Sequence, residues 1–238
     1  MSRFLSSPWI RERASEAVEY FWSKRDEQAS FARNDQGNRK AATGGGQLYH
    51  FALILRDIAL HSGYRSDDVF LDRHLELPGY FRPTKKWDVL ILRNNRLVAA
   101  LELKSHIGPS FGNNFNNRTE EALGSAVDLW TAYREKAFGD VAEAPWLGYL
   151  MLLEDHEKSR SPVSVSSRHF PVFPEFTDAS YLSRYVELCS RLVLERQYSA
   201  AGLIVAPKSD PGNYLEPNRN LGLLPFFQSF RRRLVAAK

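Results

Sequence analysis

The chain has 238 residues, of which 43% are hydrophobic and 13% aromatic, and this is enough to build a sizeable core in one domain. It carries 32 basic and 28 acidic side chains, and the net charge of +4 excludes a histone-like polycation without identifying a partner. No apolar run approaches the length of a membrane span, and the first residues lack the hydrophobic centre of a secretory signal. The one cysteine, Cys189, excludes a cysteine-based zinc site. We therefore expect a protein of a reducing compartment, without a membrane association.

Two helices are predicted before the first strand. Apolar side chains recur at three- and four-residue spacing after Ser7-Pro8, and this pattern predicts an amphipathic helix of about five turns. A polar stretch from Arg33 to Gly46 follows, which ends in three glycines but lacks the Lys-Ser/Thr of a phosphate loop. It favours a surface loop or hinge. A second helix is predicted from Leu48 to Ala59, with Gly63 in the position that a left-handed helix cap prefers.

The pattern then changes to short apolar runs that are typical of strands. Val69 to Leu71 is the first run. The segment from Trp87 to Lys104, interrupted by the turn-forming pair Asn94-Asn95, predicts a β-hairpin. The residues from His106 to Asn117 include two glycines, a proline and four asparagines, and this composition predicts a long exposed loop.

Helices and strands alternate in the second half of the chain. A helix is predicted from Arg118 to Phe138 and a buried strand from Leu147 to Leu153. The serine- and arginine-rich segment from Lys158 to His169 is expected to be mobile. A helix around Cys189, a short central strand from Ala201 to Ala206 and a basic amphipathic helix complete the chain.

These elements predict an α/β (α+β) fold with a mixed central sheet and helices on both faces. We expect one domain over residues 1–238. Its expected parts are N-terminal helices in 1–66, the hairpin with the following loop, helix and strand in 67–155, and C-terminal helices with a strand in 156–238.

Three charged residues of the predicted hairpin form a candidate site. Asp88 lies in an otherwise apolar strand, and Glu102 and Lys104 lie two residues apart on its partner, so their side chains share a face. Charges on a buried strand are costly unless they are compensated, and a divalent metal would compensate both carboxylates. The alternative is an edge strand with an ordinary Glu/Lys pair. An Asp in hairpin register favours the metal site.

Magnesium suits these residues because it prefers oxygen ligands and retains several waters. Asp88 and Glu102 would be ligands, and the carbonyl of Leu103 is a plausible third oxygen. The metal would polarise a phosphate and lower the pKa of an attacking water. Lys104 would orient that water or help to deprotonate it, and would stabilise charge on the phosphoryl oxygens. The expected reaction is hydrolysis of a phosphodiester bond.

Trp87-Asp88, followed by Leu101-Glu102-Leu103-Lys104, resembles the PD-(D/E)xK nuclease signature, with Trp87 in place of the usual proline. The wider stretch from Gly37 to Gly139 resembles the XhoI family of type II restriction endonucleases. The motifs that carry this resemblance are Asn38-Arg39-Lys40, Gly44-Gly45-Gly46, Lys85-Lys86-Trp87-Asp88, Glu102-Leu103-Lys104-Ser105 and Phe111-Gly112-Asn113-Asn114-Phe115-Asn116-Asn117-Arg118.

The resemblance implies a PD-(D/E)xK core and a type II restriction endonuclease that depends on Mg²⁺. It implies a homodimer in the bacterial cytoplasm that cuts both strands of a short palindrome in duplex DNA, with a cognate DNA methyltransferase as the partner of the system. The family suggests the sequence CTCGAG, cut after its first base and leaving 5′-phosphate ends. Composition and spacing do not indicate that site, although a two-fold symmetric dimer suits a palindrome.

Several further polar residues are candidates for supporting roles. Asparagine and arginine can read bases in the major groove, and lysines can hold the phosphate backbone, although asparagines also favour turns and a basic turn needs no ligand. The candidate DNA contacts are Lys85, Lys86, Asn113, Asn114, Asn116, Asn117 and Arg118. Helical carboxylates that could join the metal site, or lie on a solvated face, are Glu12, Glu16, Glu19, Glu120 and Glu121.

Two other functions remain open at this stage. A structure-selective or repair nuclease could use the same scaffold and site. A DNA-binding protein that does not cleave would be expected to lack one of Asp88, Glu102 and Lys104, and this chain has all three.

Overall fold

A computed structural model describes residues 4–34, 46–139 and 143–237. The α-helices are α1 (Ser7–Asn34), α2 (Tyr49–His61), α3 (Phe111–Arg134), α4 (Glu157–Arg160), α5 (Tyr181–Leu194) and α6 (Leu223–Ala236). The strands are β1 (Val69–Phe70), β2 (Glu76–Pro78), β3 (Thr84–Lys86), β4 (Val89–Arg93), β5 (Arg96–His106), β6 (Trp146–Glu154) and β7 (Ala200–Ala206). Short 3₁₀ turns are η1 (Ser66–Asp68), η2 (Pro174–Phe176) and η3 (Arg219–Leu221).

The main sheet has the strand order β1-β4-β5-β6-β7. β4 is antiparallel to both β1 and β5, whereas β5, β6 and β7 are parallel to one another. Parallel neighbours require long crossovers, and α3 and α5 provide them between β5, β6 and β7. β2 and β3 form a separate two-stranded sheet. The prediction of a mixed central sheet is therefore confirmed.

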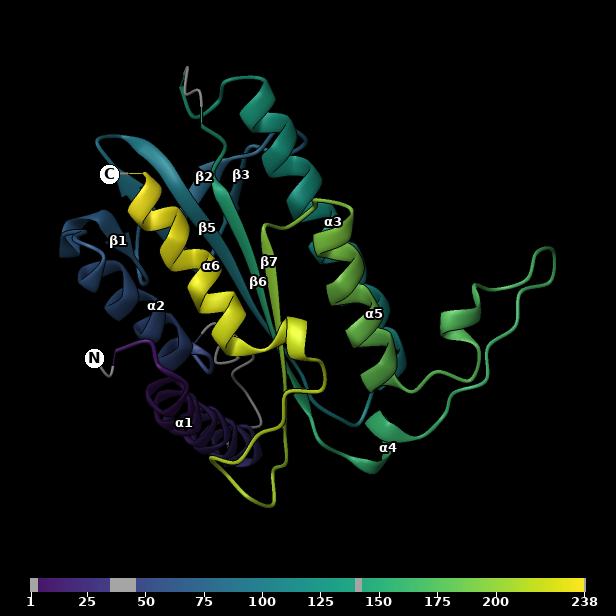
Figure 1. The fold of residues 1–238 in the computed structure, drawn as a ribbon. Helices are drawn as coiled ribbons and strands as arrows, with labels where there is room; N and C mark the ends of the chain where they lie inside the picture. The colour runs from purple at the N-terminus through teal and green to yellow at the C-terminus, as the bar shows by residue number, and fades with distance from the viewer. Residues whose placement is uncertain (1–3, 35–45, 140–142, 238) are drawn as a thin grey trace.

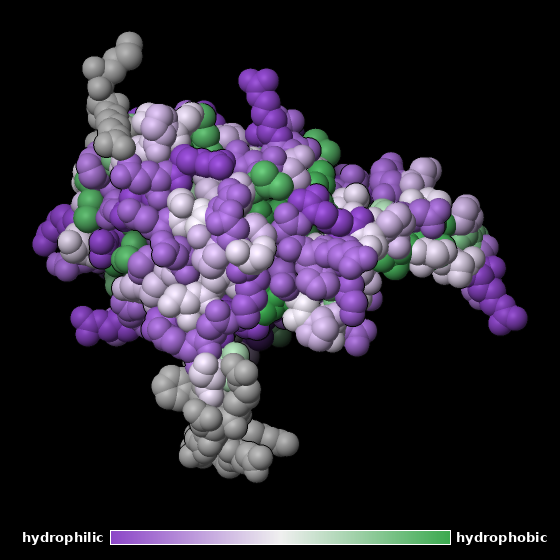
Figure 2. Space-filling view, turned by 90° about the horizontal axis from the view of Figure 1, so that it is seen from below, coloured by the Kyte–Doolittle hydropathy of each residue, from purple (hydrophilic) through white to green (hydrophobic). Residues whose placement is uncertain are grey.

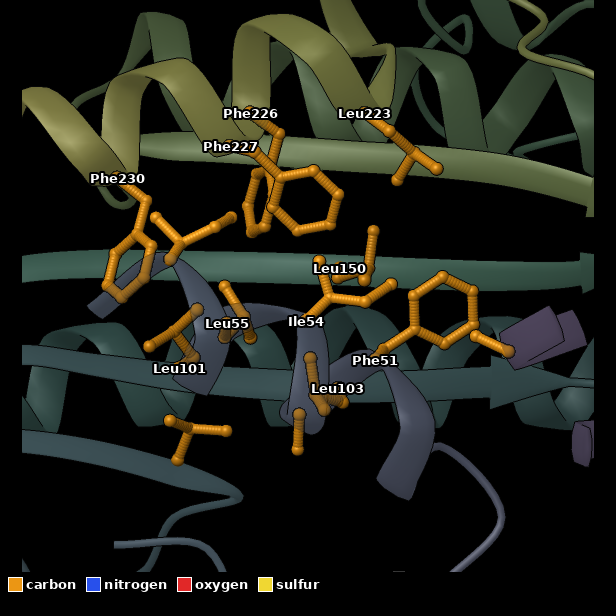
Figure 3. Packing of buried hydrophobic residues seen from close by; sticks show 14 of the residues in the cluster. Phe51, Ile54, Leu55, Leu101, Leu103, Leu150, Leu223, Phe226, Phe227 and Phe230 are labelled. Carbon is orange, nitrogen blue, oxygen red and sulfur yellow. The ribbon is translucent and has the colours of Figure 1, made fainter. Parts of the chain in front are cut away.

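Helices cover both faces of this sheet, as predicted (Figure 1). On one face, α1, α2 and α6 pack against alternate side chains of the strands. Figure 3 shows Leu55 of α2 near Leu101 of β5 and Phe51 near Leu103, with Phe226 and Phe227 of α6 above Leu150 of β6. On the other face, α3 and α5 cover the remaining strand side chains. Because side chains alternate along a strand, each sheet residue contributes to one of these two cores.

The predicted hairpin is formed by β4 and β5. Asn94 and Asn95 connect the strands with φ values of 50° and 58°, the left-handed conformation that a two-residue hairpin turn requires. Beyond the hairpin, the predicted strands at Leu147–Leu153 and Ala201–Ala206 are present in β6 and β7. β5, which carries Glu102, is therefore the central strand of the sheet, between β4 and β6.

The prediction of a long loop from His106 to Asn117 was wrong. β5 continues to His106 and α3 begins at Phe111, so only a short connection separates them. Phe111 and Phe115 are one helical turn apart, and both are buried against Tyr181. Burial of these aromatic rings outweighs the low helix propensity of the asparagines between them.

Two other segments differ from the predictions. α1 extends over 28 residues, beyond the predicted five turns, and its polar second half contains an ion pair between Lys24 and Glu27. The predicted loop from Arg33 to Gly46 lies mostly outside the described residues. α4 begins one residue before the serine-rich stretch, and part of the segment between α4 and α5 extends outward from the body and carries both hydrophobic and hydrophilic surface (Figures 1 and 2).

Candidate active site

Asp88 and Glu102 lie opposite each other at the end of the β4–β5 hairpin. Val89 pairs with Leu101 as the last pair of the ladder, and Asp88 directly precedes it, so the register places Asp88 across from Glu102. The backbone N–H of Asp88 donates to the carbonyl of Leu101 at 3.1 Å. Directly opposed side chains in an antiparallel pair share one face of the sheet. Asp88 itself lies just before β4, and the prediction that it is part of the strand needs this correction.

Glu102 is 1% exposed, and polar groups surround its carboxylate. Lys85 pairs with Oε1, the hydroxyl of Ser125 lies 3.3 Å from the same oxygen, and Tyr198 donates to Oε2 at 3.1 Å. Lys104 Nζ lies 3.7 Å from Oε1. A buried carboxylate is tolerated when it is paired and hydrogen-bonded in this way.

The Asp88 carboxylate is less well compensated than that of Glu102. Burial raises its pKa, the backbone N–H of Leu103 and the charge of Lys104 lower it, and the Glu102 charge raises it again. The net result is a pKa above the ordinary value, although the Leu103 N–H donates to Oδ2 at 2.8 Å. The hydrogen bond and the nearby lysines therefore do not fully offset the desolvation of the Asp88 carboxylate.

These oxygen atoms fit a hard divalent cation. The N–H of Leu103 points toward Asp88, and in an extended strand the carbonyl of the same residue faces the same side. Within the described residues there is no group of three or more His, Cys, Asp and Glu side chains that could hold a metal. Two carboxylates and one carbonyl match magnesium, which completes its coordination with water and substrate phosphate.

A cavity of about 230 Å³ opens beside Asp88. It is lined by Lys86 and Leu103 near the hairpin and by Tyr49 and Asp72 from the other side. Tyr49 donates to Asp72 at 3.4 Å. The exposed Lys86 therefore lies at the entrance to the carboxylates, where an anionic ligand would approach.

The candidate DNA contacts occupy two different regions. Lys85 is mainly buried and is the ion-pair partner of Glu102, which differs from the solvent-facing position expected for a phosphate contact. Asn113, Asn114, Asn116, Asn117 and Arg118 lie on the first turns of α3 instead of a loop. Each of them retains exposed or partly exposed surface, and Arg118 pairs with Glu121.

The helical carboxylates of α1 lie in another part of the surface. Glu16 pairs with Arg13 at 2.9 Å, and Glu19 lines a hollow that also includes His50. On α3, Glu120 is exposed. These contacts support the interpretation of a solvated face for Glu16 and Glu19.

Two further residues hold Glu102, and neither was predicted from the sequence. Ser125 belongs to the buried face of α3, and a polar side chain among the apolar positions Ala122, Ala126 and Leu129 was the available signal. Tyr198 lies just before β7, far along the chain, and nothing in its local sequence points to Glu102. Its position follows only from the parallel pairing of β5, β6 and β7.

Comparison with known proteins gives a consistent result. The family described as restriction endonuclease XhoI matches residues 27–215. The type II restriction enzyme BstVI of Geobacillus stearothermophilus is 52% identical over 202 residues, which cover 82% of this chain and 90% of that protein. The type II restriction enzyme XhoI of Xanthomonas vasicola is 49% identical over 185 residues, covering 75% and 73% of the two chains.

A third relative, the type II restriction enzyme AbrI of Azospirillum brasilense, is 48% identical over 163 residues, covering 66% of this chain and 72% of that protein. No solved structure matches the chain. The family match spans most of the sequence, including Asp88, Glu102 and Lys104. The chain therefore belongs to the XhoI family of restriction endonucleases, as the sequence resemblance implied.

Proposed function

We propose that this protein hydrolyses phosphodiester bonds of duplex DNA at a short palindrome, with Mg²⁺ as cofactor. The observation that carries the proposal is the opposition of Asp88 and Glu102 on one face of the hairpin, with Lys104 next to Glu102. The family consists of type II restriction enzymes, which are site-specific deoxyribonucleases and generally need a divalent metal. We also propose that the whole chain forms one nuclease domain, because helices from both ends of the chain pack on the same sheet.

Asp88, Glu102 and the carbonyl of Leu103 would hold the metal, which supplies charge neutralisation and an activated water when bound. Lys104 orients the attacking water and stabilises negative charge on the phosphoryl oxygens. Tyr198 and Ser125 fix the Glu102 carboxylate through their hydroxyls. Water attacks phosphorus, the P–O3′ bond breaks, and the products carry a 5′-phosphate and a 3′-hydroxyl.

Sequence specificity rests on the family. We propose the site CTCGAG, a homodimer with one active site for each strand, and protection of the host DNA by a cognate methyltransferase that forms no stable complex. A two-fold symmetric dimer presents the same reading residues to both halves of a palindrome. The exposed asparagines at the start of α3 and Arg118 are the proposed reading surface, and Lys86 is a proposed backbone contact.

Digestion of a mapped plasmid tests the proposal most directly. We expect discrete fragments in Mg²⁺ and intact plasmid in EDTA, and sequencing of the fragment ends will give the site and the position of the phosphate. The Glu102→Gln and Lys104→Ala variants should bind the plasmid without cutting it. A smear of fragments would contradict a restriction enzyme and would favour a structure-selective or repair nuclease. Binding in Mg²⁺ without any nick by the unaltered protein would contradict a nuclease altogether.

A localisation inside the cell also remains an expectation from the family. No helix in the described part of the chain is both long and apolar enough to cross a bilayer.

A further inference from the structure

The connection between β2 and β3 presents two aromatic side chains to solvent. Residues Gly79–Arg82 of this connection are called the aromatic tip below. Tyr80 is 53% exposed and Phe81 is 68% exposed, and their rings meet edge to face with centroids 4.9 Å apart. Large apolar side chains held together on a surface often mark a binding site.

A buried carboxylate holds the aromatic tip in place. Asp128 of α3 is 2% exposed and accepts hydrogen bonds from the backbone N–H groups of Tyr80 at 2.7 Å and Phe81 at 2.9 Å. Nε of Arg82 donates to its other oxygen at 2.6 Å. Burial raises the pKa of Asp128, but the bonds from Arg82, Phe81 and Tyr80 outweigh burial and lower it. The carboxylate is therefore charged and fully engaged at neutral pH.

Gly79 shows how closely the tip fits on this carboxylate. A Cβ at Gly79 would lie 2.8 Å from Oδ2 of Asp128 and 2.7 Å from the carbonyl of Arg82, closer than real Cβ atoms approach such groups. The aromatic pair thus projects from a turn with one defined conformation. A fixed turn loses less conformational entropy on binding a ligand than a flexible one.

The aromatic tip is attached to the candidate active site at two points. On α3, Ser125 contacts Glu102, and Asp128 lies three residues later on the same helix face. On β3, Lys85 follows the tip and pairs with Glu102. The four steps along the chain from Phe81 to Lys85 span at most roughly 13 Å between their Cα atoms, the length of about four base-pair steps of DNA.

The side chains of β2, β3 and the connection between them suit a nucleic acid. Residues 76–86 include two exposed basic side chains, Arg82 and Lys86, besides the inward-facing Lys85, and one acidic side chain, Glu76. Arg82 remains 44% exposed while it pairs with Asp128. Exposed rings can contact bases or sugars in a groove, and neighbouring cations can contact phosphates.

We propose that the aromatic tip contacts duplex DNA within about four base pairs of the cleaved bond. Tyr80 and Phe81 lie against bases or sugars in a groove, and Arg82 contacts a phosphate. This inference rests on the proposed nuclease function, because the position of the DNA is defined by the scissile phosphate at Asp88 and Glu102.

The test compares two pairs of exposed aromatic residues. The variant Tyr80→Ala/Phe81→Ala removes the aromatic pair of the tip, and Phe170→Ala/Phe173→Ala is the matched control from the segment that stands away from the body. The probe is a fluorescent duplex with the site mapped by plasmid digestion, and anisotropy in EDTA gives its dissociation constant. We expect at least tenfold weaker binding for the tip variant, equivalent to about 1.4 kcal/mol, and less than twofold for the control. The urea midpoints should remain unchanged, because all four side chains are largely exposed.

A cross-linking experiment identifies the occupant of the tip. With p-benzoylphenylalanine in place of Phe81, irradiation should join the protein to the DNA duplex. A cross-link to a second copy of the chain would overturn the proposal, and so would wild-type affinity of the tip variant while the unaltered protein still cuts DNA. If the unaltered protein neither binds nor cuts DNA, the proposed nuclease function fails first and the tip proposal fails with it.

Discussion

Replacement of Tyr198 by Phe tests whether the contact with Glu102 serves the candidate metal site. The hydroxyl of Tyr198 lies 3.1 Å from Oε2 of Glu102 and 3.1 Å from the carbonyl of Ala122. The phenol has one proton to donate, and a carboxylate oxygen is a stronger acceptor than a backbone carbonyl, so the hydroxyl donates to Glu102. Tyr198→Phe removes that proton, and Glu102 is 1% exposed, so water has little access to replace it.

The size of the effect follows from the charge of the acceptor. A hydrogen bond to a charged group contributes about 1.5–3 kcal/mol, so we expect Tyr198→Phe to lower the free energy of unfolding by about that amount. Groups that orient a metal ligand typically change metal affinity or activity by about 10- to 100-fold when they are removed. We therefore expect Tyr198→Phe to need about 10- to 100-fold more Mg²⁺ for half-maximal cleavage.

Tyr149→Phe provides a matched control. Tyr149 is also buried, its ring lies 5.3 Å from that of Tyr198, and its hydroxyl contacts the sulfur of Met151 at 3.9 Å. Urea unfolding measures stability, a Mg²⁺ titration of single-turnover cleavage measures metal dependence, and calorimetry measures Mg²⁺ binding without catalysis. Equal Mg²⁺ dependence of the two variants would refute the orienting role of Tyr198, even if Tyr198→Phe were less stable.

Three further predictions concern charge and packing. Lys85→Met should lower the free energy of unfolding by about 3 kcal/mol because it leaves Glu102 without its closest cation. Mg²⁺ should raise the urea midpoint of this variant more than that of the unaltered protein. Equal midpoint shifts would contradict this role of Lys85. Burial lowers the pKa of His106 to about 4, so its unfolded form alone gains a proton as pH falls from 6.5 toward 4, and stability should fall by about 3 kcal/mol over that range. Urea unfolding of His106→Gln should lack this component, and an unchanged pH profile would argue against it. Phe230→Ala should lower the free energy of unfolding by about 3–5 kcal/mol because Phe230 is fully buried between α6 and the sheet. Phe173→Ala, at an exposed position, should change it by less than about 0.5 kcal/mol. Similar shifts of the melting temperature for both variants would be inconsistent with this core.

The hairpin and the parallel strands were predictable because their signals are local. Asn94-Asn95 specifies the turn, and the uniformly apolar run in β6 is typical of a strand buried on both faces. The start of α3 was not predictable from composition, because asparagine-rich residues fold there only through burial of Phe111 and Phe115. Position along the chain likewise gave no reason to place Tyr198 beside Glu102.

The role of Lys85 likewise depends on the fold and not on its local sequence. Adjacent lysines before Asp88 suggested a contact with the DNA backbone, and the sequence contains no signal that separates Lys85 from Lys86. In the structure, Lys85 turns inward to Glu102 and packs over the ring of Trp87 at 4.4 Å, while Lys86 is exposed. Alternation along β3 separates the two side chains, and this requires knowledge of which face of β3 meets the active site.

The charges of the candidate site explain why metal and DNA are expected to bind together. Asp88 and Glu102 carry two negative charges when ionised, and Lys85 and Lys104 lie close enough to balance them. A divalent cation added alone therefore leaves an excess of positive charge in a largely buried cluster, and such an excess is costly. Phosphates of DNA supply the missing negative charge. By linkage, Mg²⁺ must then strengthen DNA binding by the same factor as DNA strengthens Mg²⁺ binding. Calorimetric titrations with Ca²⁺ in place of Mg²⁺, carried out with and without duplex DNA on the unaltered protein and on Glu102→Gln, measure this factor. Equal affinity of the unaltered protein for Ca²⁺ in both conditions would contradict the charge argument.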